Sequence, residues 1–300
     1  AIRESFLQAA ELVGRETELA LLRQNLDKSS DSQGSTWIIG GESGVGKTRL
    51  VDEIRTRALV NGVLVLRGQA VNTGGRIYQI WHDILRDLTL YADATDAEAS
   101  ILKTIDSSLV DVLDHDIVDL EALDPQETQN HLFESVASML KRLDQPLMII
   151  LEDMQWAGKE SLVLLRYLNK NLISNASIFV LGNYRDDERP NLSKELPNVN
   201  FLKLERLQRN AIADLSASML GNEVGRRETI VQLLERETEG NVFFIVEVVR
   251  ALAENAGQLE AIGQMTLPQN VFAEGVKTVI QQRLAHVPSE HLPLLKLVAV

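Results

Sequence analysis

The sequence has no cysteine, which excludes disulfide bridges and thiolate metal sites. It also lacks long hydrophobic runs: no apolar stretch approaches the roughly 18 residues that a membrane-spanning helix needs. The first residues lack the basic and then apolar pattern of a secretory signal peptide. Together these absences predict a cytoplasmic protein with no membrane partner.

Positive charge is scarce. Lys and Arg number 30 against 43 Asp and Glu, and the net charge is −13. Because nucleic-acid binding depends on clustered Lys and Arg, we expect no direct nucleic-acid binding by this segment.

The negative excess is concentrated in residues 91–124, which hold ten acidic residues and one lysine. We expect an acidic helical insert there, with a solvated carboxylate face; metal binding by these carboxylates is the alternative. Helical spacing is kept by six apolar residues: Ile101, Leu102, Ile105, Leu109, Val112 and Leu113.

The sequence does contain a phosphate-binding motif. Gly41 to Thr48 reads Gly-x4-Gly-Lys-Thr, after an apolar run and before apolar residues at helical spacing. Its glycines permit backbone geometry in which successive N–H groups point at phosphate oxygens, Lys47 reaches the β- and γ-phosphates, and the Thr48 hydroxyl ligates Mg²⁺. We therefore predict ATP or GTP binding with Mg²⁺. The expected contacts from this segment are Gly41, Ser43, Gly44, Val45, Gly46, Lys47, Thr48 and Arg49.

Two acidic residues follow the apolar strand predicted at 147–151. The carboxyl ends of strands are where ligands bind in open α/β sheets, so we expect Glu152 to be the Mg²⁺-side acid and Asp153 to polarise the attacking water. A solvated acidic turn is the alternative. A further strand at 177–181 leads to Arg185, whose guanidinium suits γ-phosphate sensing. The alternative for Arg185 is pairing with Asp186, Asp187 or Glu188 in a surface loop.

Apolar runs alternate with helical patterns up to residue 204, which predicts an α/β fold: a three-layer P-loop NTPase with a parallel sheet. After that point the strand signals stop and helical patterns dominate. We expect a nucleotide-binding domain at 1–204, an all-helical lid at 205–267 and the start of a winged-helix-like unit at 268–300.

With these motifs in place, the chain resembles the AAA-type ATPase module of the STAND class, the signal-transduction ATPases with numerous domains. Leu12 to Glu16 looks like the family's N-terminal motif, and the resemblance implies that Val13, Gly14 and Arg15 lie on the adenine side of the nucleotide. Residues 151–157 resemble its acidic strand end, and residues 183–185 its sensor segment. Residues 238–244 resemble the lid motif, which implies nucleotide contacts from Gly240 and Asn241.

Two residues depart from the family pattern. Val242 stands where the lid motif has proline, which puts the nucleotide contact there in doubt while leaving the fold intact. Glu152 stands where Asp is commoner, and its extra methylene affects hydrolysis more than binding. We expect Trp156 to pack under the strand edge and not to stack on the base.

The resemblance implies an ATP-binding signalling switch with slow ATP hydrolysis, the regulatory module of a larger multidomain protein. ATP or ADP and Mg²⁺ are the implied cofactors. An effector, such as a Ser/Thr kinase, and a helical-repeat sensor are the expected partners in the same polypeptide, with nucleotide-dependent self-association. The chain begins at Ala1 and stops within an apolar pattern, so we expect a fragment. Two alternatives remain: an oligomeric AAA-type remodelling ATPase with Arg189 or Arg206 as an arginine finger, and a hydrolysis-dead nucleotide-binding scaffold.

Overall fold

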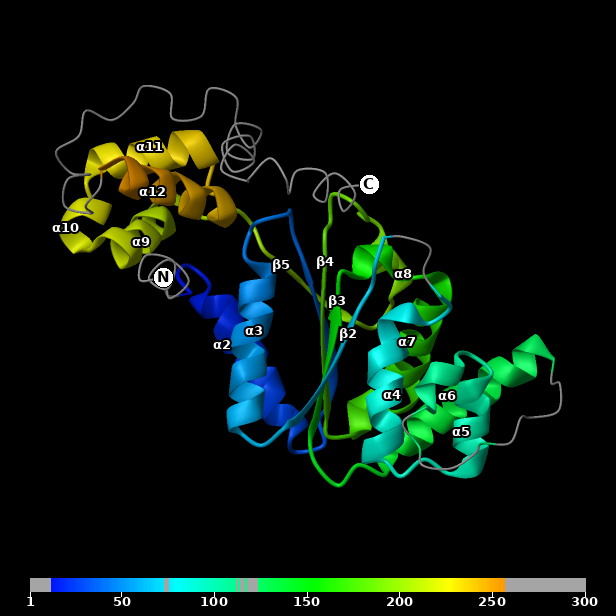
Figure 1. Cartoon of the computed structure of the whole chain (residues 1–300). Coiled ribbons are helices and arrows are strands. Elements are labelled where there is room, and N and C mark those ends of the chain that lie inside the picture. Colours follow the sequence, from blue (N-terminus) through cyan, green and yellow to red (C-terminus); the bar gives the residue numbers. More distant parts are fainter. Residues whose placement is uncertain (1–11, 73–75, 112, 114–116, 118–123, 257–300) are drawn as a thin grey trace. The chain divides into compact units, whose positions relative to one another are not determined.

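A computed structural model describes residues 12–72, 76–111, 113, 117 and 124–256 (Figure 1). The described chain divides into two compact units, residues 15–205 and residues 12–14 with 206–256. No helix in the described part of the chain is both long and apolar enough to cross a membrane.

The first unit is built on a parallel sheet of five strands in the order β2-β3-β4-β1-β5. The strands are β1 (Ser35–Gly40), β2 (Leu64–Gln69), β3 (Leu147–Glu152), β4 (Ile178–Tyr184) and β5 (Asn200–Lys203). Every residue of β3 and β4 is buried, as their uninterrupted apolar runs predict for central parallel strands. All five carboxyl ends lie along one edge, and the phosphate loop follows β1 there while Asp153 follows β3.

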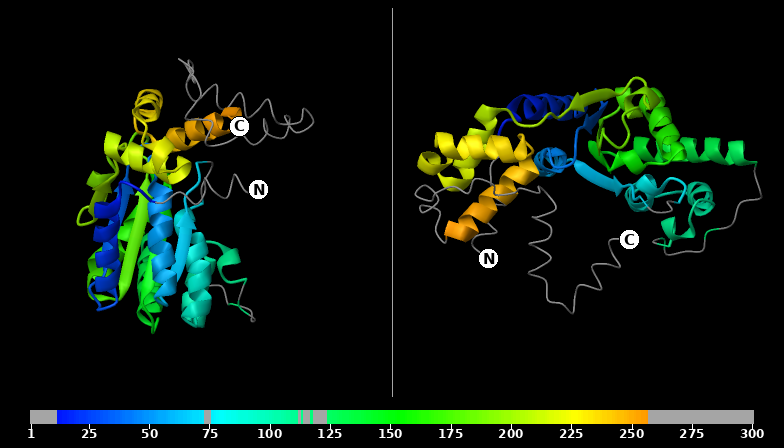
Figure 2. Two further views of the ribbon diagram at one scale, coloured as in Figure 1. Left: turned by 90° about the vertical axis from the view of Figure 1, so that its left-hand side faces the viewer. Right: turned by 90° about the horizontal axis from the view of Figure 1, so that it is seen from above.

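Helices cover both faces of this sheet, so the predicted three-layer α/β fold is confirmed. Figure 1 shows α2 and α3 on one side and α4, α6 and α7 on the other, and Figure 2 shows α2 beside α3. The helices are α2 (Glu16–Ser29), α3 (Lys47–Val60), α4 (His82–Tyr91), α5 (Asp96–Lys103), α6 (Pro125–Lys141), α7 (Lys159–Asn171) and α8 (Leu192–Glu195).

The acidic segment forms a shorter helix than its apolar spacing predicts. A capping box between Thr95 and Glu98 starts α5, and the helix ends at Lys103. Asp106 then caps a separate 3₁₀ turn, Ser107–Leu109, by accepting from the backbone N–H of Ser108. The break between helix and turn follows from this cap, because the Asp106 side chain satisfies backbone donors locally. Residues 112, 114–116 and 118–123 lie outside the described residues.

The second unit is helical in its described part, with α9 (Arg209–Leu220), α10 (Asn222–Gly225), α11 (Glu228–Thr238) and α12 (Val242–Ala256). Buried residues from α9, α11 and α12 form its core. Gly14 belongs to this unit: its φ is +69°, and a Cβ there would lie 2.6 Å from the Ala211 Cβ. The winged-helix-like unit expected at 268–300 lies outside the described residues.

Candidate functional site

The phosphate loop joins β1 to α3, as its sequence motif requires. Gly44 and Gly46 have φ of +82° and +101°, a region that side chains other than glycine rarely enter. A Cβ on Gly41 would lie 2.6 Å from the Leu204 carbonyl oxygen, so this glycine lets the loop pack against the chain that leaves β5. Helix α3 begins at Lys47, and Ser43, Thr48 and Arg49 are exposed around its N-terminus. The loop thus presents backbone donors and a helix N-terminus together, a site suited to phosphate.

Lys47 lies inside this loop. Its Nζ donates to the Gly41 carbonyl at 2.7 Å and to the Glu42 carbonyl at 2.8 Å. Burial, followed by the positive charge of Arg185, lowers the Lys47 pKa, and the carboxylates of Asp186, Asp187 and Asp153 oppose that shift. The lysine, the sensor segment after β4 and the acid after β3 are therefore close enough to influence one another electrostatically.

The two acids at the end of β3 are both engaged. Glu152 is only 4% exposed, and its Oε2 accepts from the Arg67 Nε at 2.5 Å. Asp153 has a left-handed backbone with φ of +53°, and accepts from Gln69 Nε2 at 2.8 Å and from Gln155 Nε2 at 3.2 Å. Arg67 and Gln69 both come from the neighbouring strand β2. Strand β2 thus supplies a partner to each acid.

Asn183 is a residue that the sequence analysis did not place in the catalytic set. It lies on β4 beside Ile39 of β1, is 3% exposed, and its Oδ1 accepts from the Asp153 backbone N–H at 3.2 Å. Its Nδ2 is buried and has no hydrogen-bond partner within the described residues. A buried donor without a partner costs about 1–3 kcal/mol, which makes this amide a candidate for a ligand contact. The signal for it in the sequence is an amide near the end of an apolar strand.

Arg185 is paired with a carboxylate of its own loop. Its Nη1 lies 2.7 Å from Glu188 Oε1, and its guanidinium lies 5.6 Å from the centre of the Trp156 ring. The Trp156 Nε1 donates to the same glutamate at 3.0 Å. Trp156 packs partly buried against the core of the first unit. The γ-phosphate role of Arg185 stays a prediction, and in this structure its charge is paired with Glu188.

Arg15 connects the phosphate loop to the end of the first unit. Its side chain is buried, and its Nη2 donates to the Val45 carbonyl at 3.1 Å and to the Glu205 carbonyl at 2.5 Å. Val13 and Gly14, which precede it, belong to the second unit. Their predicted adenine-side contacts stay predictions.

The lid motif forms the turn between α11 and α12. Gly240 has φ of +82°, and a Cβ there would lie 2.2 Å from the Leu207 carbonyl oxygen. Asn241 is buried and accepts from the Phe243 backbone N–H at 3.1 Å, which places it at the start of α12. Their predicted nucleotide contacts also stay predictions.

The residues present suit a magnesium ion that is shared with a nucleotide. Within the described ranges no group of three or more His, Cys, Asp or Glu could hold a metal by itself. Mg²⁺ is commonly held by one or two protein oxygens together with substrate phosphates. Thr48, at the start of α3, and Glu152, at the end of β3, are the candidates for that partial ligand set.

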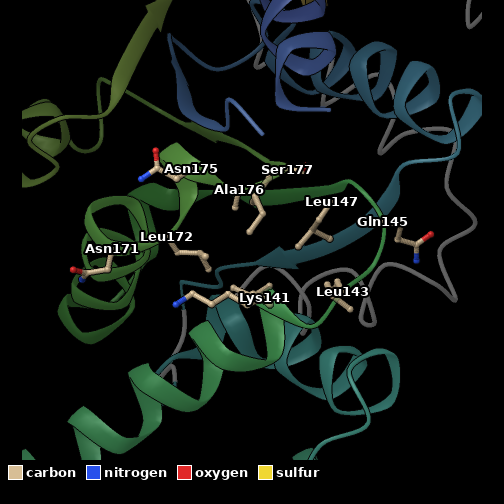
Figure 3. A pocket seen from close by; sticks show the side chains of 11 residues that line it. Lys141, Leu143, Gln145, Leu147, Asn171, Leu172, Asn175, Ala176 and Ser177 are labelled. Carbon is tan, nitrogen blue, oxygen red and sulfur yellow. The ribbon is translucent and has the colours of Figure 1, made fainter. Parts of the chain in front are cut away.

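A cavity of about 430 Å³ lies at the opposite edge of the sheet, where β3 and β4 begin (Figure 3). Leucines and amide side chains line it, with Lys141 at its border. It contains none of the predicted phosphate or metal contacts and is separate from the candidate site.

A family model described as an AAA ATPase domain matches residues 11–181. No curated protein matches the chain significantly. A chain from a Drosophila ORC structure bound to DNA is similar, with 14% identity and a TM-score of 0.52 over 96% of this chain and 68% of that one. A chain of the E. coli MS115-1 HORMA:CdnC:Trip13 complex has 12% identity and a TM-score of 0.51 over 89% and 93%. The Aeropyrum pernix ORC1 protein in complex with DNA has 18% identity and a TM-score of 0.47 over 87% and 68%.

One expectation is corrected here. The expectation of no direct nucleic-acid binding, which rests on net negative charge, is contradicted, because a chain of similar fold belongs to the Drosophila ORC structure that is bound to DNA. Net charge is a poor criterion because binding depends on local charge and on backbone donors. In this chain most of the excess negative charge lies in residues 91–124.

Proposed function

The chain belongs to the family of AAA ATPase domains, and we propose that it is an ATP-binding signalling switch of the STAND class with slow hydrolysis. In this proposal it is the regulatory module of a larger multidomain protein whose effector and helical-repeat sensor lie in the same polypeptide.

The observation that supports this best is the meeting of three strand ends. Strands β1, β4 and β3 are neighbours, and they bring together Lys47, Asn183 and the acids Glu152 and Asp153. We propose that Lys47 contacts the β- and γ-phosphates, that Asp153 orients the attacking water, and that the free donor of Asn183 senses the γ-phosphate together with Arg185. Thr48 and Glu152 would hold Mg²⁺, which supplies charge stabilisation to the phosphates when bound.

Slow turnover is supported by the state of the acids. Each oxygen of Asp153 accepts an amide hydrogen bond, and Glu152 is paired with Arg67. Gln69 and Gln155 hold the Asp153 carboxylate in place and occupy one acceptor site on each oxygen, which leaves fewer sites and less freedom for aligning a water. Such an arrangement favours holding the nucleotide over rapid chemistry.

A role as a switch is supported by the position of Arg15. The chain passes between the two units at residues 14–15 and again at 205–206. Arg15 lies at one crossing, and its guanidinium bonds both the Val45 carbonyl of the phosphate loop and the Glu205 carbonyl at the other crossing. We propose that a change in the phosphate loop on nucleotide exchange is passed through Arg15 to both points where the chain crosses to the second unit, as a population shift.

The remodelling ATPase is the rival function, and it requires an arginine supplied to a neighbouring subunit. Both candidate arginines are already paired: Arg189 with Glu195 and three carbonyls, Arg206 with Glu239. Turnover per subunit should therefore stay constant as protein concentration rises. A steep rise with assembly would favour the rival, and DNA should be added as a separate arm because a structural neighbour binds it.

The absence of cysteine allows a direct test of the switch. Ser30 and Asn222 are exposed in the first and second units, so the double variant Ser30→Cys/Asn222→Cys accepts a fluorescence energy-transfer pair. We expect transfer efficiency to differ between ADP and a non-hydrolysable ATP analogue, and to be unchanged by nucleotide when Lys47→Ala is added. Equal efficiency in both bound states would reject the switch.

A further inference from the structure

We propose that Arg67 competes with the metal ion for Glu152 and thereby sets how strongly nucleotide binding depends on Mg²⁺. This inference rests on the proposed function, because it assumes that Glu152 serves the metal bound with the nucleotide. It adds a positioning residue, on β2, to the site formed by β1, β3 and β4.

The contact between Arg67 and Glu152 is specific. The Nε of Arg67 lies 2.5 Å from Glu152 Oε2, and its Nη2 pairs with the same oxygen. The register of β2 against β3 places Gln69 opposite Glu152, so the arginine reaches the acid from two residues earlier on the strand. A positive charge is thus already in place at the carboxylate that the metal needs.

The two partners differ in their freedom to move. The Glu152 side chain is 6% exposed, whereas the Arg67 side chain is 48% exposed. A buried carboxylate without a counter-charge is costly, but a guanidinium that moves from this position enters water. Arg67 is therefore the partner that can leave, and Glu152 is the one that must always keep a cation.

The backbone of strand β2 is closely packed next to Arg67. A Cβ on Gly68 would lie 1.8 Å from the Ile80 carbonyl oxygen, so the backbone of β2 is in close contact with the turn Gln79–Trp81. Exchange between the two cations is therefore expected by rotation of the half-exposed Arg67 side chain and not by movement of the strand. Gln69, beside it, gives a neutral amide to Asp153 and does not compete in the same way.

The consequence is a prediction about metal dependence. Without metal, Arg67 neutralises Glu152, so the triphosphate meets less repulsion. With metal, the same arginine has to be displaced. Both effects make the ratio of nucleotide affinity with and without Mg²⁺ smaller than it would be without Arg67.

The test is calorimetric titration of the full chain with AMPPCP, in Mg²⁺ and in EDTA, for wild type and Arg67→Met. We expect the metal-linked ratio to rise about fivefold in the variant, the scale of one half-exposed ion pair. The matched control is Arg142→Met, which breaks a pair of similar exposure, 36% for Arg142 after α6 and 10% for Glu98 of the acidic segment. It should lower stability and leave the ratio unchanged.

A ratio that stays constant or falls in Arg67→Met would overturn the proposal, since Arg67 would then only support Glu152. If wild type binds AMPPCP neither in Mg²⁺ nor in EDTA, both the proposed function and this inference are rejected. That outcome can be told apart from a constant or falling ratio, which rejects the inference alone. If Arg67→Met does not fold, NMR of arginine Nε–H groups in wild type decides, with Arg67→Lys used for assignment. We expect the Arg67 signal to shift with Mg²⁺ and AMPPCP and to shift little with AMPPCP in EDTA; equal shifts in both would contradict competition.

Discussion

Arg189 is one of the two candidate arginine fingers, and its contacts allow a test of whether it stabilises the fold of its own subunit instead. Its Nη1 lies 2.7 Å from the Ala157 carbonyl, 3.3 Å from the Met154 carbonyl and 3.4 Å from the Gln155 carbonyl. Its Nε and Nη2 lie 3.0 and 2.7 Å from the two oxygens of Glu195. The residue thus fastens the turn that directly follows the two acids. Arg189→Met keeps most of the side-chain length and removes every one of these bonds.

The expected loss of stability follows from the bonds. A hydrogen bond from a charged donor contributes about 1.5–3 kcal/mol to the free energy of unfolding. We assign that amount to the short bond with the Ala157 carbonyl and a negligible amount to the two longer bonds. The pair with Glu195, which is 36% exposed, adds less than about 1 kcal/mol. The sum is about 1.5–4 kcal/mol, which in a domain of this size lowers Tm by roughly 3–16 °C.

The assay combines thermal unfolding with ATP turnover. Arg166→Met is the matched control, since its guanidinium makes a single bond of 3.4 Å to the Glu195 carbonyl and should cost less than about 1 kcal/mol. If Arg189 is a finger that acts on a neighbouring subunit, Arg189→Met keeps its stability and loses ATP turnover. Mixing it with Lys47→Ala subunits then restores turnover, because those subunits supply an intact Arg189. That combination of results would refute the structural role.

Three further predictions follow from the site and the acidic segment. Asp153→Asn should slow single-turnover hydrolysis about a hundredfold or more while changing ATP affinity less than about twofold, and an equal loss of affinity would move Asp153 from chemistry to binding. Asn183→Leu, which removes the free donor, should weaken AMPPCP binding about tenfold and leave ADP binding unchanged by calorimetry; equal losses for both would argue against γ-phosphate sensing. Burial raises the pKa of Glu98, but hydrogen bonds from Arg142 and Thr95 outweigh burial and hold that pKa at about 2. The ionised carboxylate therefore stabilises the fold fully at pH values above its unfolded pKa near 4.5, and this stabilisation is lost as the pH falls toward 2. The urea-unfolding difference between wild type and Arg142→Met should therefore be largest near pH 7 and shrink below about pH 4.5, and a constant difference would contradict this.

The sheet could be predicted from the sequence because its central strands are continuous apolar runs. The predicted strand 147–151 is β3 (Leu147–Glu152), and the predicted strand 177–181 is β4 (Ile178–Tyr184). Periodicity overestimated α5, because the side chain of Asp106 starts a new turn that apolar spacing cannot reveal.

The partners of the site residues could not be predicted, because they come from distant parts of the chain. Arg67 and Glu152 are 85 residues apart in sequence and meet only because β2 and β3 are adjacent. The free donor of Asn183 likewise depends on how β1, β4 and β3 pack together. The sequence does not distinguish Arg189, a candidate arginine finger, from an ordinary surface arginine, and its contacts with the 154–157 turn appear only in the structure.

The central claim, that ATP binds at the loop from Gly41 to Thr48, is tested most directly by calorimetric titration of Lys47→Ala with ATP and Mg²⁺. Lys141→Ala is the control, because that lysine borders the cavity at the opposite edge of the sheet. We predict that wild type and Lys141→Ala bind ATP alike and that Lys47→Ala binds about a hundredfold more weakly or not at all. Unchanged ATP affinity in Lys47→Ala would contradict the site assignment.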